Sequence, residues 1–159
     1  MLIQLLVIIL SVEQFLRGQQ FVRGFTPFKV QYIVNIENNL NNDNLDVHCH
    51  EYKQRYIDYG SHHLLKNANY SITLKASVLF DVRKITCTLT CFLNCNTTVR
   101  FRAFFSDPKF IDNECGGRHC FFKLEDDGIY LYNIKKTKYA KYMMWWNNSS
   151  IKEFDYNDL

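Results

Sequence analysis

The chain of 159 residues is close to the usual size of one domain, and its 47% hydrophobic content is typical of a protein that folds. A mean hydropathy of -0.24 excludes a protein with several membrane spans. Two prolines and six glycines exclude collagen and proline-rich linkers, and a net charge of +3 is too small to indicate nucleic-acid binding. Six cysteines and an aromatic content of 16% are the features that need an explanation.

The N-terminus carries an apolar run from Met1 to Leu10, about half the ~20 residues that a membrane-spanning helix needs. A short apolar run followed by polar residues is typical of a secretory signal peptide. We therefore predict a signal peptide over residues 1–18 and a secreted, extracellular protein without membrane insertion. A buried N-terminal helix or strand is the alternative. Residues 19–27 are predicted to be a flexible lead-in.

Two further features agree with export. Four asparagines begin an Asn-x-Ser/Thr triplet, the acceptor for N-linked glycans on secreted proteins: Asn69, Asn96, Asn147 and Asn148. An even number of cysteines in a short chain suggests a disulfide framework when the compartment is oxidising. We expect glycans at these asparagines and a disulfide-bonded domain.

Most of the remaining chain alternates between hydrophobic and polar residues. In residues 28–37 this period of two predicts a half-buried strand. The same pattern predicts further strands over residues 45–50, 70–75, 85–95, 99–105, 120–124, 129–132 and 139–146. The segments between them are predicted to be loops, the longest over residues 38–44, 51–68 and 106–118.

No stretch of the chain shows a convincing helical period. Many short strands at intervals of about ten residues favour an antiparallel sandwich or barrel. We predict an all-β fold, an antiparallel β-sandwich of about seven or eight strands, disulfide-bonded and secreted. It would occupy residues 28–146, and residues 147–159 would form a polar C-terminal tail.

Several short motifs follow one another in a distinctive order: Val47-His48-Cys49, Asp58-Tyr59-Gly60, Tyr70-Ser71-Ile72, Thr88-Leu89-Thr90-Cys91, Cys115, Cys120 and Asp127-Gly128-Ile129-Tyr130. Their order and spacing over residues 28–146 resemble the plant self-incompatibility S-protein family. The resemblance implies a small secreted β-sandwich held by disulfides and without enzymatic activity. Founding members of that family act as pistil ligands recognised by pollen. Tyr59 departs from the family pattern, in which leucine is usual.

The resemblance also implies two disulfides among the four cysteines at family positions, Cys49, Cys91, Cys115 and Cys120. Four cysteines allow three pairings, and the sequence alone does not choose among them. The pairing of Cys49 with Cys120 and of Cys91 with Cys115 is preferred.

Cys87 and Cys95 are additions to the family pattern. Eight residues of continuous strand span roughly 26 Å, whereas a disulfide needs Cα atoms ~4.4–6.8 Å apart. The two cysteines pair with each other only if the strand breaks between them, for example near Asn94. Otherwise one of them exchanges with a family cysteine, or both stay free and buried.

The sequence offers no convincing catalytic or metal site. His48 and His50 flank Cys49, but in a strand their side chains point to the face opposite the cysteine, which disfavours a Cys–His nucleophile. No Cys-x-x-Cys pair of the kind that structural zinc prefers is present. We therefore predict no catalytic residue, no metal ligand, no cofactor and no enzymatic activity.

The partner is predicted to be a plasma-membrane receptor on another cell, contacted by the loops of a monomeric protein, as in pollen–pistil recognition. A secreted defence or carbohydrate-binding protein of the cell wall is the alternative. Lys135, Lys136 and Lys138, close to aromatic residues of the last strand, motivate this alternative, because they can contact an acidic polymer. Lysines that protect a sheet edge from association are the favoured interpretation of the same residues.

Overall fold

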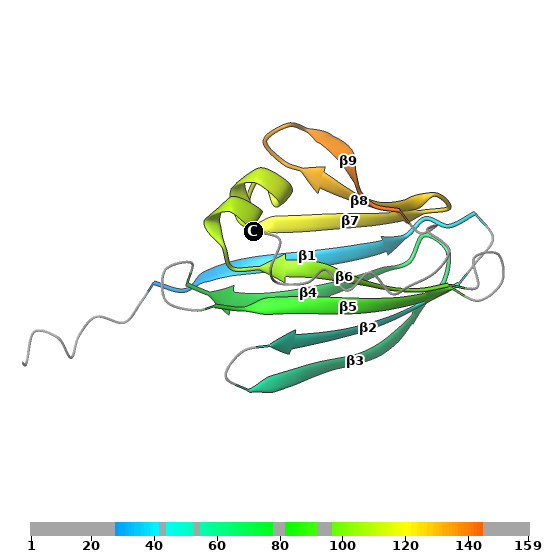
Figure 1. Cartoon of the computed structure of the whole chain (residues 1–159), viewed down its shortest axis with the longest axis horizontal. Coiled ribbons are helices and arrows are strands. Elements are labelled where there is room, and N and C mark those ends of the chain that lie inside the picture. The colour runs from blue at the N-terminus through cyan, green and yellow to red at the C-terminus, as the bar shows by residue number, and fades with distance from the viewer. Residues whose placement is uncertain (1–27, 42–43, 53–54, 78–81, 92–96, 145–159) are drawn as a thin grey trace, which may run out of the picture.

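The computed structural model describes residues 28–41, 44–52, 55–77, 82–91 and 97–144, which form two β-sheets (Figure 1). The five-stranded sheet has the order β4-β1-β7-β8-β9 and the four-stranded sheet the order β3-β2-β5-β6. The first consists of β1 (Val30–Asn38), β4 (Asn69–Ala76), β7 (His119–Glu125), β8 (Gly128–Asn133) and β9 (Lys138–Met143). The second consists of β2 (Leu45–Tyr52), β3 (Tyr56–Leu64), β5 (Lys84–Cys91) and β6 (Thr97–Phe105).

The core lies between the two sheets and comes from the inward half of each alternating strand. In β1 the residues that alternate with partly exposed ones, from Tyr32 to Ile36, are buried. Rings from opposite sheets meet there: Phe101 of β6 lies 5.0 Å from Phe122 of β7, and Tyr32 of β1 lies 5.2 Å from Phe104 of β6. Burial of each large side chain contributes about 1.5–3 kcal/mol, so the facing rows hold the sheets together.

The predicted all-β sandwich is confirmed, with two differences. The described residues contain nine strands, because β3 forms within residues 51–68, where a loop was expected. β3 is an edge strand with mostly exposed side chains and a bulge at Gly60, so its sequence lacks the clean alternation of a half-buried strand. In addition, β1 pairs with β7 in parallel, whereas the other strand pairs are antiparallel.

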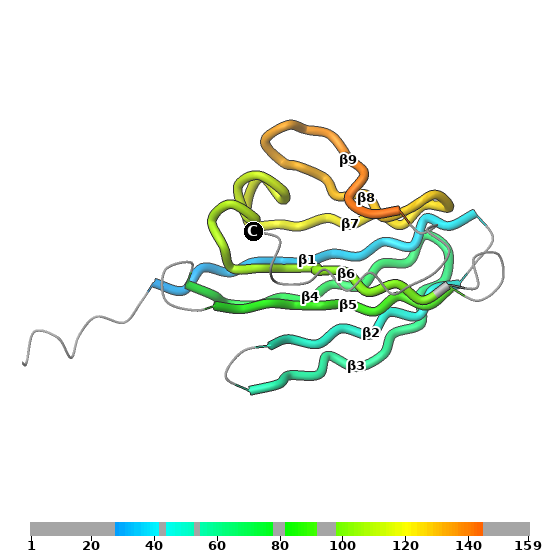
Figure 2. Tube along the Cα trace, in the orientation of Figure 1, coloured from blue at the N-terminus to red at the C-terminus, as the bar shows by residue number. Residues whose placement is uncertain are grey.

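The expected loop at residues 106–118 contains a short π-helix, η1 (Phe110–Cys115). Asp107 starts this segment by accepting a hydrogen bond from the backbone N–H of Lys109 at 2.8 Å. The buried Asn133 at the end of β8 donates through Nδ2 to the carbonyl oxygen of Asn113 at 2.7 Å. Gly116, with φ of 71°, then lets the chain turn back. The segment is therefore fixed to β8, and Figure 2 shows it beside the β8–β9 hairpin at one margin of the molecule.

The disulfides differ from the preferred pairing. Cys49 of β2 is joined to Cys87 of β5, directly opposite it in the sheet, with their Cα atoms 4.1 Å apart. Cys115 at the end of η1 is joined to Cys120 at the start of β7, with Cα atoms 4.8 Å apart. The preferred pairing is wrong because β2 lies beside β5, so the added Cys87 takes the place of a family cysteine. Cys91 is also disulfide-bonded.

Some predicted features lie outside the described residues. They are the signal peptide, the lead-in at residues 19–27, the tail at residues 147–159, Cys95 and the sequons at Asn96, Asn147 and Asn148. Among the described residues, no helix has the length and apolar character needed to cross a bilayer.

Candidate functional site

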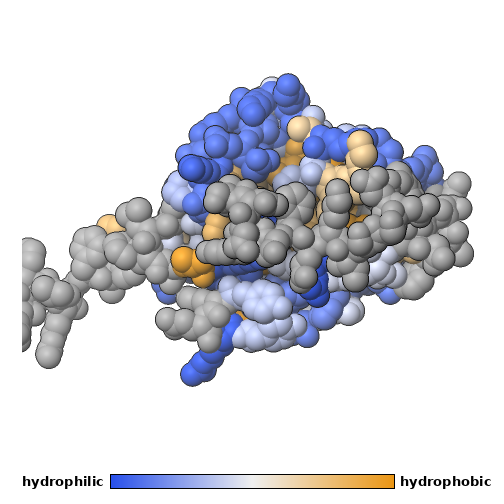
Figure 3. Space-filling model, viewed as in Figure 1, coloured by the Kyte–Doolittle hydropathy of each residue, from blue (hydrophilic) through white to orange (hydrophobic). Residues whose placement is uncertain are grey.

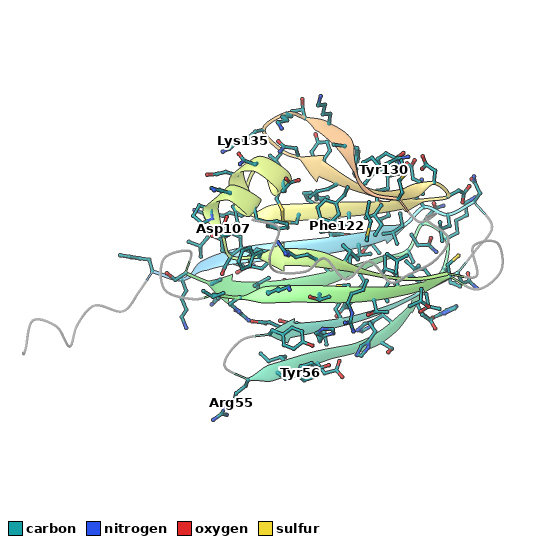
Figure 4. All side chains as sticks on the ribbon, in the orientation of Figure 1. Arg55, Tyr56, Asp107, Phe122, Tyr130 and Lys135 are labelled. Carbon is teal, nitrogen blue, oxygen red and sulfur yellow. A yellow bond between two sulfur atoms is a disulfide. The ribbon has the colours of Figure 1, made fainter. Side chains whose placement is uncertain are left out.

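The outer face of the four-stranded sheet gathers basic, hydroxyl and aromatic side chains. Alternation along β2 turns Cys49 and Glu51 inward and His48 and His50 to the other face, and the register places residues of β5 and β6 beside them. We call the resulting set the outer face: His48, His50, Tyr52, Tyr56, Asp58, Lys84, Thr86, Thr88, Arg100 and Arg102. Figure 4 shows Tyr56 at the β3 margin of this sheet.

A pocket of about 230 Å³ opens on the outer face where β2, β5 and β6 run side by side. It is lined by His50, Tyr52, Lys84, Thr86, Arg100, Phe101 and Arg102. Two buried atoms of this lining, Nε2 of His50 and Nε of Arg102, have no hydrogen-bond partner in the part of the chain that the structure describes. His50 is 5% exposed, so water does not replace the missing partner freely.

The surroundings of His50 keep its imidazole neutral. Burial lowers the pKa of His50, and the neighbouring Arg100, His48 and Lys84 lower it further, while Asp58 acts in the opposite direction. A neutral imidazole has one nitrogen that donates and one that accepts. The pocket therefore combines Arg102, which is always a cation, with His50, which can either donate a hydrogen bond to a hydroxyl or accept one from it.

Aromatic rings form the rim of the pocket on the β3 side. The Tyr56 ring stacks on His50 with centroids 5.5 Å apart, and the Tyr52 ring meets His50 edge-on at 4.8 Å. Both tyrosines keep about half of their surface exposed, 51% for Tyr52 and 56% for Tyr56. The rings fix the orientation of His50 and offer apolar surface to a ligand.

A bulge in β3 positions Asp58 at the border of the outer face. Gly60 adopts φ of 78° there, and its N–H donates to Oδ1 of Asp58 at 2.8 Å. The same oxygen lies 2.8 Å from Nε2 of His48. These two hydrogen bonds lower the pKa of Asp58 and so favour its ionised carboxylate. The negative charge of Asp58 is thus engaged beside the pocket.

Behind the outer face lies a buried ion pair between Glu51 of β2 and Arg83. Nη2 of Arg83 donates to Oε2 of Glu51 at 2.6 Å, and Nε donates to Oε1. The Tyr59 hydroxyl donates to the same carboxylate at 2.7 Å, and burial, followed by Glu51, raises the pKa of Tyr59. Arg83 also donates to the carbonyl oxygen of Lys75 in β4, so the pair ties the two sheets together. We interpret this cluster as structural.

One end of the sandwich brings three connections together. The N–H of Asn41, after β1, donates to Oδ1 of Asp126 between β7 and β8 at 3.0 Å. Nζ of Lys66, between β3 and β4, donates to the carbonyl oxygen of Asn41 at 2.8 Å. A hollow of about 420 Å³ lies here, lined by Asn39, Asn41, Glu125, Asp126, Asp127 and Tyr130. We call this group of turns the turn end.

The predicted lysine cluster is only partly available to an acidic polymer. Nζ of Lys135 lies 2.8 Å from Oδ1 of Asp112 in η1, and Lys141 is paired with Asp127. Lys136 and Lys138 are exposed, the latter on the edge strand β9. Figure 3 shows a strongly hydrophilic surface over the β8–β9 hairpin and η1. This placement agrees with lysines that protect a sheet edge.

The structure places the other predicted site residues as follows. Asn69 is exposed at the first residue of β4, where a glycan has room. Asn38, predicted to lie in a recognition loop, is instead buried at the end of β1, where its Nδ2 donates to the carbonyl oxygen of Leu64 at 2.9 Å. Across the described ranges, no group of three or more His, Cys, Asp or Glu residues is placed to hold a metal ion.

Most of the pocket could not be found from the sequence. Alternation along β6 puts Arg100 and Arg102 on one strand face, but it does not join them to His50 or Lys84, which lie on other strands. The alternation of residues 46–52 was the available signal, because it extends the second strand to Tyr52 and puts His48, His50 and Tyr52 on one face.

Comparison with known families decides the relationship of the chain. The family model described as plant self-incompatibility protein S1 matches residues 33–146. The chain belongs to this family. The matched span includes nearly all of both sheets, so the family's domain is the sandwich itself. No curated protein matches the chain, and no solved structure matches it. The outer-face pocket and the turn end both lie within this self-incompatibility S1 domain.

Proposed function

We propose that this self-incompatibility S1 protein is a secreted, non-enzymatic ligand for a plasma-membrane receptor on another cell, with pollen–pistil recognition as one setting. The family match over residues 33–146 carries the proposal. A frame held by disulfides and a buried ion pair supports it, because rigid scaffolds present recognition residues on their loops.

The turn end is the receptor-contacting surface in this proposal. Its three connections are hydrogen-bonded to one another, so they hold their shape before binding, and little conformational entropy is lost on contact. Lys66 lies exposed among these connections. Lys29 is also exposed, but it lies just before the first residue of β1, at the end of that strand away from the turn end. This pair of lysines provides a matched test.

The test uses labelled protein consisting of residues 19–159 and plasma-membrane vesicles from candidate target cells. We expect saturable binding that unlabelled protein displaces and soluble glycans do not. Lys66→Ala should weaken binding at least about fivefold, which corresponds to about 1 kcal/mol, whereas Lys29→Ala should not. Non-saturable binding, or displacement by glycans, would contradict the receptor proposal.

Secretion and glycosylation are tested with the full chain in plant cells. We expect the protein in the medium, its retention when residues 2–18 are deleted, and a mass decrease after enzymatic removal of N-glycans. Asn69→Gln should remove part of that mass, since Asn69 is exposed. Retention of the intact chain in the cytosol would contradict export. A monomeric mass in light scattering and inactivity toward hydrolase substrates complete the expected behaviour.

A second candidate function is binding to cell-wall carbohydrate in defence. The exposed Lys136 and Lys138 favour it, together with Tyr139, which is 43% exposed on the same edge strand. Binding to an acidic wall polysaccharide that disappears when Lys135, Lys136 and Lys138 are all changed to alanine would support this candidate. Unchanged binding in that variant would remove the hairpin from consideration.

A further inference from the structure

The outer-face pocket contains two buried polar atoms that have no hydrogen-bond partner among the residues that the structure describes. Arginine keeps its proton under all ordinary conditions, so Nε of Arg102 is always a donor. Such a donor, buried without an acceptor, bears its full desolvation penalty, and folded proteins rarely retain this arrangement unless a bound group supplies the acceptor. Nε2 of His50, on the other side of the pocket, is also buried without a hydrogen-bond partner among the described residues.

The register sets how far apart these atoms are anchored. His50 of β2 is opposite Thr86 of β5, and Thr86 is opposite Arg102 of β6. Neighbouring strands lie about 4.8 Å apart, so the backbones of His50 and Arg102 are separated by roughly 9.6 Å, with the small Thr86 between them. A gap of this width admits a ring that bears polar groups on opposite sides.

The size of the pocket favours a group larger than a single inorganic ion. Its volume of about 230 Å³ equals that of roughly seven to eight water molecules in the liquid, so a phosphate or sulfate ion fills only part of it. One sugar unit fills it better. The exposed rings of Tyr52 and Tyr56 at the rim supply the flat apolar surface on which a sugar ring can pack.

The chemistry of the two unpaired atoms indicates which sugar. Nε of Arg102 needs an acceptor and favours a negatively charged one, and a carboxylate matches the geometry of a guanidinium as well as a phosphate does. His50, neutral and able to donate or accept, suits a hydroxyl, which has both capacities. Thr88 continues the hydroxyl row of Thr86 along the outward side of β5, in line with a chain of linked sugars.

We propose that the outer-face pocket binds a uronate unit of an acidic oligosaccharide, with Nε of Arg102 donating to its carboxylate and His50 meeting a ring hydroxyl. The inference rests on the second candidate function, carbohydrate binding, and places it on a different surface from the lysines of the hairpin. Figure 4 shows Tyr56 on β3 and Lys135 at the β8–β9 turn on opposite sides of the molecule, so the two surfaces can be altered separately.

The experiment is calorimetric titration of the protein comprising residues 19–159 with trigalacturonate. The comparison ligands are its methyl ester, inorganic phosphate and triglutamate. We expect trigalacturonate to bind at least about tenfold more tightly than the ester, which keeps the ring and removes the charge. Phosphate should bind at least tenfold more weakly than trigalacturonate. Equal affinity for phosphate, or equal or tighter binding of triglutamate, would overturn the sugar assignment, and so would no detectable binding of trigalacturonate at millimolar concentration.

Two variants locate the site. Arg102→Gln should weaken trigalacturonate binding at least tenfold, whereas Arg118→Gln, at an exposed arginine outside the pocket, should leave it unchanged. Thr86→Val keeps the β-branched shape while removing the hydroxyl, and it should weaken binding about threefold or more with an unchanged circular-dichroism spectrum. Equal effects of the two arginine variants, or no effect of Thr86→Val, would overturn the proposal that the ligand binds in this pocket.

The triple alanine variant at Lys135, Lys136 and Lys138 separates the two carbohydrate surfaces. If it binds trigalacturonate normally while Arg102→Gln does not, the pocket is supported. If the lysine variant alone loses binding, the pocket inference fails and the hairpin candidate stands. The receptor proposal is measured with membranes and remains independent of both results.

Discussion

Replacement of Glu51 by glutamine tests whether the buried ion pair supports the sandwich. The Glu51 side chain is 0% exposed and the Arg83 side chain 12%, so the substitution removes the carboxylate charge that faces this guanidinium in the interior. Removal of one partner of a buried pair costs about 3–5 kcal/mol, and because glutamine still accepts one hydrogen bond we expect about 3 kcal/mol. For a domain of this size that lowers Tm by roughly 10–20 °C.

The assay is urea denaturation followed by circular dichroism. Glu125→Gln is the matched control, since Glu125 lies 2.7 Å from Lys123 in a pair whose carboxylate side chain is 36% exposed, and such surface pairs contribute about 0–1 kcal/mol. A loss in Glu51→Gln below about 1 kcal/mol, or no larger than in the control, would refute the reasoning. The double variant Glu51→Leu with Arg83→Met should recover much of the loss, because neither charge then remains buried.

Three further predictions concern stability. Burial and Arg100 lower the pKa of His50 in the folded state. The stability contributed by the neutral imidazole is therefore complete above about pH 6.5, the usual pKa of histidine, and is lost as the pH falls through the folded-state pKa. We expect His50→Gln to flatten that part of the pH dependence of the urea midpoint. Gly116→Ala should cost about 3 kcal/mol in the same assay against about 1 kcal/mol for Gly60→Ala, because both glycines have positive φ but only at Gly116 would a Cβ approach other atoms, 2.6 Å from a side-chain oxygen of β8. Replacing both cysteines of the β2–β5 disulfide, whose sequence separation is 38, by alanine should cost about 4 kcal/mol, against about 2 kcal/mol for the disulfide that follows η1, whose separation is 5; equal losses would contradict the loop-entropy argument.

The strands that alternate cleanly could be predicted from the sequence, because burial on one side leaves a period of two in the residue pattern. β3 could not, since an edge strand with little burial carries no such pattern, and its bulge at Gly60 breaks what alternation there is. The parallel contact of β1 with β7 was equally hidden. It joins segments far apart in the chain, and no local preference specifies which strands become neighbours.

In the candidate site, too, the strand faces could be predicted from the sequence and the neighbouring strands could not. Alternation alone puts His48 and His50 on the outward side of one strand and Arg102 on the outward side of another. That His50 and Arg102 line one pocket depends on the order β2-β5-β6 and on a bulge beside Ile85, which shifts the register so that Arg102 faces Thr86. The cysteine pairing failed for the same reason, because it depends on which strand lies beside β2.

The parallel contact between β1 and β7 has a consequence for biosynthesis. The strands of the four-stranded sheet come from one continuous stretch of the chain interrupted only by β4, so that sheet and its disulfide can assemble while the ribosome is still translating. β1, by contrast, precedes the other described strands in the chain and needs β7, which follows all four strands of that sheet. The side of β1 that pairs with β7 therefore stays open until β7 has been made, and closure of the domain comes late in folding.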